Sequence, residues 1–162
     1  MRAHATELGI ATDQILAGGG SAGGHVAAAS ALTQGFDEDC DVLTISPRPA
    51  ALVLFNPVFD NSPEGYGYDR VKDYWEAFSP MHNIAEGAPP TIVFLGTKDK
   101  LIPVATAEAY KAKMEAIGSR CDLHLYEGQG HGFFNAKNKE YYDKTVAEMD
   151  RFLVSLGYLD AG

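Results

Sequence analysis

Short apolar runs alternate along the chain with longer segments in which apolar residues recur at helical spacing. The apolar runs predict four strands, at 15–18, 51–55, 91–96 and 121–126. The longer segments predict helices at 2–8, 21–34, 69–78, 103–117 and 139–156. Because strands and helices alternate, the pattern predicts an α/β fold: three α/β/α layers around a mainly parallel sheet of about four strands.

The last predicted helix carries an apolar stripe that we assign to the hydrophobic core. Its members are Tyr142, Val146, Met149, Phe152, Leu153 and Leu156. No internal repeat, low-complexity tract or linker interrupts the chain. A length of 162 residues suits one domain, so we expect residues 1–162 to form a single domain.

Composition and charge exclude several classes of partner. The net charge is −9 and no lysine or arginine cluster is present, which argues against nucleic acid. The longest apolar run, 50–55, is too short to span a membrane. The two cysteines lack metal-ligand spacing and are expected to be free thiols. The first residues contain no apolar signal-peptide segment, so we expect a cytoplasmic location for the chain as expressed, with the compartment otherwise unknown.

A glycine-rich segment follows the first predicted strand and has a serine at its centre. Residues 19–23, Gly-Gly-Ser-Ala-Gly, fit the pattern G-x-S-x-G, a sharp strand-to-helix turn that exposes the serine hydroxyl. The serine backbone is strained there, and we expect side chains at Gly19 and Gly23 to collide with the turn. The next helix directs its free N–H groups toward the same point, which stabilises a developing anion. Ser21 is therefore a candidate nucleophile.

The same letters also fit a dinucleotide-binding pattern. Residues 18–23 match G-x-G-x-x-G in the same strand–turn–helix context. The local pattern therefore leaves two interpretations open, and the rest of the chain must distinguish them.

Polar residues also follow the other three predicted strands. Asp60, Asp99 and His131 come after the second, third and fourth strands, and the carboxyl ends of parallel strands meet at one edge of a sheet. A serine nucleophile needs an imidazole base, and the imidazole needs a carboxylate that selects its tautomer. A dinucleotide site gives no reason for these residues. The set favours a Ser-His-Asp triad with Asp99 as the acid and Asp60 as the alternative, and we expect structural roles for the other four histidines.

Six short segments, spread over nearly the whole chain, extend this pattern. They are 19–25 (GGSAGGH), 46–49 (SPRP), 55–60 (FNPVFD), 79–84 (SPMHNI), 96–103 (GTKDKLIP) and 128–133 (GQGHGF). In this order they resemble the esterase and lipase group of the α/β-hydrolase superfamily, which includes acetyl-xylan, feruloyl and related carboxylesterases.

The resemblance implies a carboxylesterase that cleaves small esters through an acyl-enzyme, without a metal or organic cofactor. Ser21 would be the nucleophile, His131 the base and Asp99 its orienting acid, and Ala22 would supply one oxyanion-hole N–H. Apolar residues near the strand ends are candidates for an acyl pocket: Pro57, Phe59, Leu101, Ile102 and Phe133.

The chain also departs from this group. Its members have several strands and a His-Gly-Gly-type loop before the elbow, and that loop supplies the second oxyanion donor. Here the elbow lies at residue 21 and no His-Gly-Gly precedes it. We interpret the chain as the C-terminal half of such an enzyme. Strand 15–18 would then be an open edge that pairs with another chain, giving a homodimer or larger assembly.

Loss of one oxyanion donor typically lowers kcat by about 10²–10³, so we expect any activity to be weak. Two alternatives remain at this point. One is a serine peptidase of the prolyl-oligopeptidase type, whose catalytic domain shares the ordered motifs. The other is a catalytically silent half-domain that binds a partner through its open sheet edge.

Overall fold

Four parallel strands form one sheet in the order β1-β2-β3-β4. The computed structural model describes residues 1–160, and its strands are β1 (Ala17–Gly20), β2 (Leu52–Phe55), β3 (Thr91–Gly96) and β4 (Cys121–Tyr126). The parallel α/β sheet is as expected from the pattern. The first strand, expected at 15–18, begins and ends two residues later than the apolar run predicts. The hydrogen bonds between β1 and β2 extend through the glycines up to Ser21, and they define the strand.

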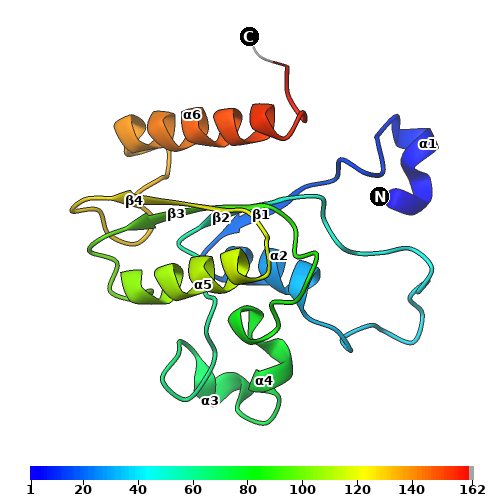
Figure 1. The fold of residues 1–162 in the computed structure, drawn as a ribbon, viewed down its shortest axis with the longest axis horizontal. Coiled ribbons are helices and arrows are strands. Elements are labelled where there is room, and N and C mark those ends of the chain that lie inside the picture. The colour runs from blue at the N-terminus through cyan, green and yellow to red at the C-terminus, as the bar shows by residue number, and fades with distance from the viewer. Residues whose placement is uncertain (161–162) are drawn as a thin grey trace.

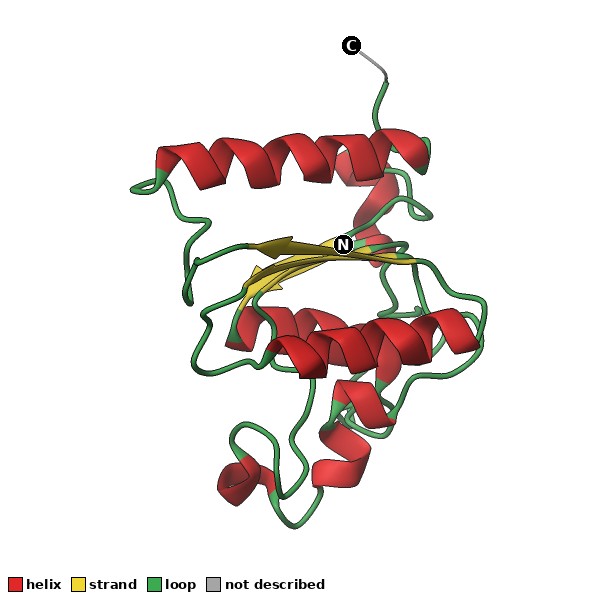
Figure 2. Ribbon diagram, turned by 60° about the vertical axis from the view of Figure 1, so that its left-hand side comes forward, coloured by secondary structure: helices red, strands yellow, loops and turns green. Residues whose placement is uncertain are grey.

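Helices cover both faces of the sheet, which confirms the three-layer arrangement. Figures 1 and 2 show α6 (Lys139–Ser155) on one face, and α2 (Ala22–Leu32) with α5 (Val104–Ala116) on the other. The remaining helical turns are short: η1 (Arg2–His4), α1 (Ala5–Leu8), α3 (Tyr68–Val71), α4 (Trp75–Phe78) and η2 (Pro80–His82). The single helix expected at 69–78 is divided because the backbone at Tyr74, with φ −144°, leaves the helical region.

Side chains of the central strands alternate between two hydrophobic clusters, as a strand buried on both faces requires. Leu52 and Leu54 of β2 belong to the cluster under α2 and α5. Val53, between them, belongs to the cluster under α6. A continuous apolar run in the sequence therefore supplies both cores at once.

The C-terminal helix packs through Phe152 and Leu153, which are 2% and 7% exposed. Tyr142, expected in the same stripe, is 43% exposed, so that assignment is wrong. Tyr141 packs in its place, with its ring against Tyr126 and Phe133. Both tyrosines are compatible with a helical period, and the contact with these two rings selects Tyr141.

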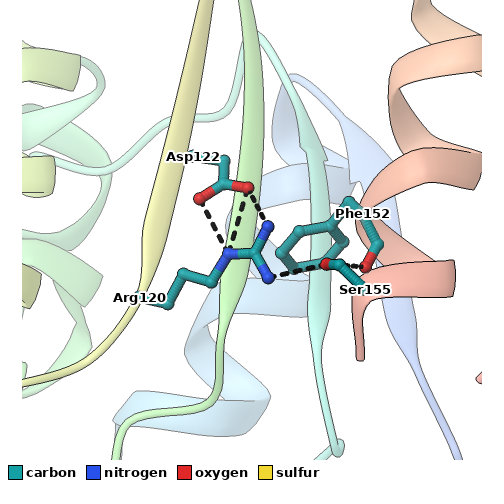
Figure 3. A network of polar contacts seen from close by, with 4 residues as sticks. All are labelled: Arg120, Asp122, Phe152 and Ser155. Atoms are coloured by element: carbon teal, nitrogen blue, oxygen red, sulfur yellow. Dashed lines mark hydrogen bonds and ion pairs between the residues drawn. The ribbon is translucent and has the colours of Figure 1, made fainter. Parts of the chain in front are cut away.

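A polar network at the start of β4 holds the end of α6 (Figure 3). The Arg120 guanidinium donates to both carboxylate oxygens of Asp122 and, at 2.7 Å, to the Ser155 hydroxyl. Its central carbon lies 4.9 Å from the centroid of the Phe152 ring. The network attaches the last turn of α6 to the sheet next to the apolar contact made by Phe152.

The two cysteines are free thiols: Cys40 is exposed and Cys121 is buried. Burial raises the pKa of the Cys121 thiol to about 12, which leaves it protonated and unreactive at neutral pH. Among the helices of residues 1–160, none is long and apolar enough to cross a membrane.

Candidate active site

Ser21 lies at the sharp turn between β1 and α2. Its backbone has φ 54° and ψ −118°, a conformation that a non-glycine residue rarely adopts. Two hydrogen bonds hold the turn: the Ser21 N–H donates to Phe55 O at 2.9 Å, and His25 N–H donates to Ser21 O at 3.0 Å. The geometry is that of a strained strand-to-helix elbow at the carboxyl edge of the sheet.

The glycines around Ser21 have different reasons to be glycine. A Cβ on Gly19 would lie 2.5 Å from the Gly23 carbonyl carbon, so no side chain fits there. A Cβ on Gly23 would meet nothing within 4 Å, and the expected collision at this position is therefore absent. Gly24 is also crowded, because its Cβ would lie 2.8 Å from the Cβ of Pro57. Gly24 allows α2 to approach the loop that follows β2.

His131 and Asp99 form a close pair between the loops that follow β4 and β3. The distance from His131 Nδ1 to Asp99 Oδ2 is 2.8 Å. The Asp99 side chain is 0% exposed, whereas that of His131 is 28% exposed. Asp99 Oδ1 accepts hydrogen bonds from the backbone N–H groups of Leu101 and Ile102, at 2.8 and 3.1 Å. The carboxylate is thus held by its own loop and presents its other oxygen to the imidazole.

Asn56 contacts the other side of the imidazole, and the sequence analysis did not identify it. Its Nδ2 lies 3.1 Å from His131 Nε2, and its Oδ1 accepts a hydrogen bond from Gly132 N–H at 3.2 Å. Asn56 is 1% exposed and has φ 34°. One signal was available: Asn56 is a polar residue that directly follows a fully apolar strand, as Ser21 follows β1.

Ser21 and His131 belong to the same edge of the sheet. Within residues 1–160, the Ser21 hydroxyl makes no hydrogen bond to the His131 ring, whose two nitrogens bond Asp99 and Asn56. Ala22 is the first residue of α2, so its N–H has no acceptor inside the helix. That N–H lies next to the candidate nucleophile and is available to an oxyanion. The part of the chain that the structure describes holds no group of three or more His, Cys, Asp or Glu suited to a metal ion.

Asp60, the alternative acid, has a local partner instead of a histidine. Its Oδ1 accepts a hydrogen bond from Ser62 N–H at 2.8 Å, which forms a turn after β2.

His25 is buried, and its Nε2 lies 2.9 Å from Asn61 Oδ1. Burial lowers the pKa of His25, and the hydrogen bond to Asn61 offsets this only in part. These contacts give both residues a structural role.

Three of the five candidate pocket residues line one cavity. Phe59, Leu101 and Ile102 surround a space of about 190 Å³, together with Asp60 and Tyr66. The cavity is adjacent to the loop that holds Asp99, since Leu101 and Ile102 donate to its carboxylate.

The other two candidate pocket residues lie elsewhere. The structure places Pro57 against Gly24. Phe133 lies in the hydrophobic cluster under α6, where it is 5% exposed.

Comparison with known proteins gives a consistent set of similarities. A family model described as alpha/beta hydrolase fold matches residues 1–135. Esterase LipC of Mycobacterium tuberculosis is 28% identical over 156 residues, which cover 82% of this chain and 38% of that protein. The chain therefore spans less than half the length of this curated relative.

Solved structures show the same similarity at higher identity. The structure of Thermogutta terrifontis esterase 2 phosphorylated by paraoxon superimposes with a TM-score of 0.90 at 40% identity, covering 99% of this chain and 61% of that one. The propionate-bound form of the same esterase gives a TM-score of 0.90 at 39% identity, covering 99% and 62%. Nearly every described element of this chain thus has a counterpart in that esterase.

Proposed function

Because this chain belongs to the α/β-hydrolase fold family, we propose that it is a serine hydrolase of the carboxylesterase type that cleaves small carboxylic esters. The observation that carries the proposal is the contact of 2.8 Å between His131 and the buried Asp99, on the sheet edge where the strained Ser21 follows β1. A base oriented by a carboxylate, on the same sheet edge as a serine in an elbow, is the set of groups that acyl transfer requires.

In the proposed reaction, Ser21 Oγ attacks the ester carbonyl and His131 Nε2 accepts the hydroxyl proton. The tetrahedral oxyanion accepts a hydrogen bond from Ala22 N–H at the start of α2. The intermediate then expels the alcohol, which takes the proton from His131, and leaves an acyl group on Ser21. Water, activated by the same imidazole, attacks the acyl carbon and regenerates the serine.

Two features support a short acyl group. The cavity beside Leu101 and Ile102 has a volume of about 190 Å³, comparable with the roughly 150 Å³ that accommodates a molecule of the size of benzene, so it suits a small acyl group. The solved relative with bound propionate holds a three-carbon acid. We therefore propose acetate to butyrate esters as substrates.

The test is hydrolysis of p-nitrophenyl acetate and butyrate by the purified chain, next to Ser21→Ala. We expect slow turnover by the wild type and none above background by the variant. Ser30→Ala makes the same change on the exposed side of α2 and should retain the wild-type rate. Labelling of Ser21 by a fluorophosphonate gives a second readout that does not depend on turnover.

The alternatives give different outcomes in the same experiment. Cleavage of peptide amides at a rate comparable with that of esters would indicate a peptidase. Equal background rates in wild type and Ser21→Ala, together with no fluorophosphonate labelling, would overturn the esterase proposal in favour of a silent binding domain.

We also propose that the edge of β1 pairs with another copy of the chain. Within the described residues, β1 has a neighbouring strand on one side only, and Gly18 in it is exposed. An edge strand with free N–H and C=O groups and no charged side chain is a site for strand pairing.

A further inference from the structure

The side-chain amide of Asn56 connects the candidate base to the strand next to the candidate nucleophile. Building on the proposed function, we propose that Asn56 is a positioning residue for His131. Together with Asp99, it holds the imidazole in the tautomer that carries its proton on Nδ1, and it orients the ring so that the lone pair of Nε2 lies at the edge of the sheet where Ser21 is located.

The donors and acceptors around the His131 ring show which ring nitrogen carries the proton. Gly132 N–H can only donate, so the Asn56 atom that it contacts at 3.2 Å is the amide oxygen. The amide nitrogen then faces His131 Nε2 at 3.1 Å and must donate to it. Nε2 therefore carries no proton, and Nδ1 donates to Asp99 at 2.8 Å. The tautomer required of a general base follows from contacts at both ends of the ring.

The position of Asn56 in the sheet explains why it can reach the ring. It directly follows β2, which lies between β1 with Ser21 and β3 with the Asp99 loop. Its N–H donates to Phe94 O at 2.7 Å, which anchors it to β3. The His131 loop, which follows β4, crosses the end of β3 and meets Asn56 there.

The backbone at position 56 also suits asparagine. With φ 34°, Asn56 adopts a conformation that asparagine tolerates better than most residues. A residue that is 1% exposed and strained needs compensation from its contacts. The two side-chain hydrogen bonds to residues 131 and 132 supply it, and they couple the conformation of the base loop to the end of β2.

The proposed role has a defined place in the reaction. In the resting site the Asn56 amide donates a hydrogen bond to His131 Nε2. When substrate is bound, the Ser21 hydroxyl must replace the amide as the donor to Nε2 or share this acceptor with it. Once Nε2 has accepted the serine proton it is itself a donor, so Asn56 releases it and the proton moves on to the leaving alcohol oxygen. Asn56 gains and loses no proton in this cycle.

Two substitutions tolerate the positive φ and change the contact in opposite ways. Asn56→Gly removes the donor, and Asn56→Asp replaces it with an acceptor of the same shape. A carboxylate there would favour the doubly protonated imidazolium, held between two acids. For Asn56→Asp we expect kcat to fall by about tenfold or more with KM little changed. The acidic limb of the kcat/KM profile should also move up by about one pH unit.

Nitrogen-15 NMR of the His131 ring tests the same idea without any turnover, with His131→Gln used to assign the signals. In the wild type at neutral pH, Nε2 should resonate as an unprotonated nitrogen and Nδ1 as a protonated one. In Asn56→Asp both should be protonated. In Asn56→Gly the proton should stay on Nδ1, because Asp99 still accepts from it, and the Nε2 signal should move to the position of a nitrogen that accepts no hydrogen bond from the protein. Asn61→Asp is the matched control, since it makes the same change in a buried amide next to a different ring, that of His25.

The outcomes separate this proposal from the esterase proposal. Wild-type nitrogen signals and an unmoved acidic limb in Asn56→Asp would overturn the role of Asn56, whatever the activity. A wild type inert toward esters and fluorophosphonate, with the expected changes of the nitrogen signals in the Asn56 variants, would overturn the function and leave the positioning role. A shift of the limb in Asn61→Asp as large as in Asn56→Asp would show that the effect is not local and would also contradict the proposal.

Discussion

Ser21 and Asn56 are the two non-glycine residues with positive φ in the described part of the chain, at 54° and 34°. Each directly follows the last residue of a strand, and the two strands are neighbours. Backbone strain is concentrated at residues where a side chain must take an unusual direction. At this site the strained backbone of Asn56 brings its amide to His131, and the strained Ser21 lies at the same edge of the sheet.

At the residue scale, the elbow glycines allow a sharp prediction. Gly19→Ala places a methyl group 2.5 Å from the Gly23 carbonyl carbon, so the free energy of unfolding should fall by about 1–3 kcal/mol. Gly23→Ala meets open space in the first turn of α2 and should raise that free energy by about 0.5–1 kcal/mol. Urea unfolding of both variants tests this contrast, and equal losses would show that the elbow needs glycine at both positions.

At the element scale, His25 connects α2 to the segment that follows β2. Its Nε2 bonds Asn61 Oδ1, and its ring lies 4.5 Å from that of Phe78 in α4. Asn61 in turn donates to Tyr66 O at 3.0 Å. The buried ring of His25 therefore links α2 to the segment of Asn61 and Tyr66 and to α4.

Burial makes this link sensitive to pH. It lowers the pKa of His25 in the folded protein below its ordinary value of 6.5. At a pH between the folded pKa and 6.5, the unfolded chain therefore binds a proton that the folded chain does not. Stability is then complete above the unfolded pKa and is lost as pH falls through 6.5 toward the folded pKa. The free energy of unfolding should decrease as the pH falls below about 6.5, and by less in His25→Gln. Parallel urea titrations measure the difference, and identical pH dependence would contradict the prediction.

Helix α6 shows what a periodic pattern of apolar residues can predict and what it cannot. Period and composition predict the helix at 139–156, and the structure has it at Lys139–Ser155. Several rotations of this helix place apolar residues inward, and contacts with Tyr126 and Phe133 select the one that partly buries Tyr141 and exposes Tyr142. The existence of the element is a local property, whereas its orientation depends on packing.

At the scale of the whole molecule, two hydrophobic clusters share one sheet. This supports our proposal that residues 1–162 form one domain, whose last two residues lie outside the described part. The sheet ends at β1 on one side and at β4 on the other.

The edge of β1 leads to a prediction about assembly. We expect sedimentation velocity to give at least twice the mass of one chain, because pairing along β1 satisfies its free backbone groups. Ile15→Lys, which adds a charge just before this edge, should shift the protein toward the monomer. Leu125→Lys, at an exposed position on β4, is the control and should leave the mass unchanged. A monomer at all concentrations would contradict the proposed pairing.

The sequence by itself determined the alternation of elements, the parallel sheet and the positions of the candidate triad residues. These follow from local rules: the hydrophobic period selects strand or helix, and a glycine-flanked serine between them selects the elbow. Ser21, Asp99 and His131 follow the first, third and fourth strands, and the carboxyl ends of parallel strands place their loops at one edge of the sheet.

The contact between Asp99 and His131 could be expected from the sequence, whereas only the tertiary structure decided the other side-chain contacts at that edge. Asn56 and His131 are 75 positions apart, and their contact depends on strand order and loop path. Gly24 is crowded because of Pro57, which is distant in sequence. Such contacts form only when the folded chain brings the two residues together, so no pattern of neighbouring residues predicts them. The candidate nucleophile could therefore be proposed from its neighbours in the chain, but the second partner of the candidate base could not.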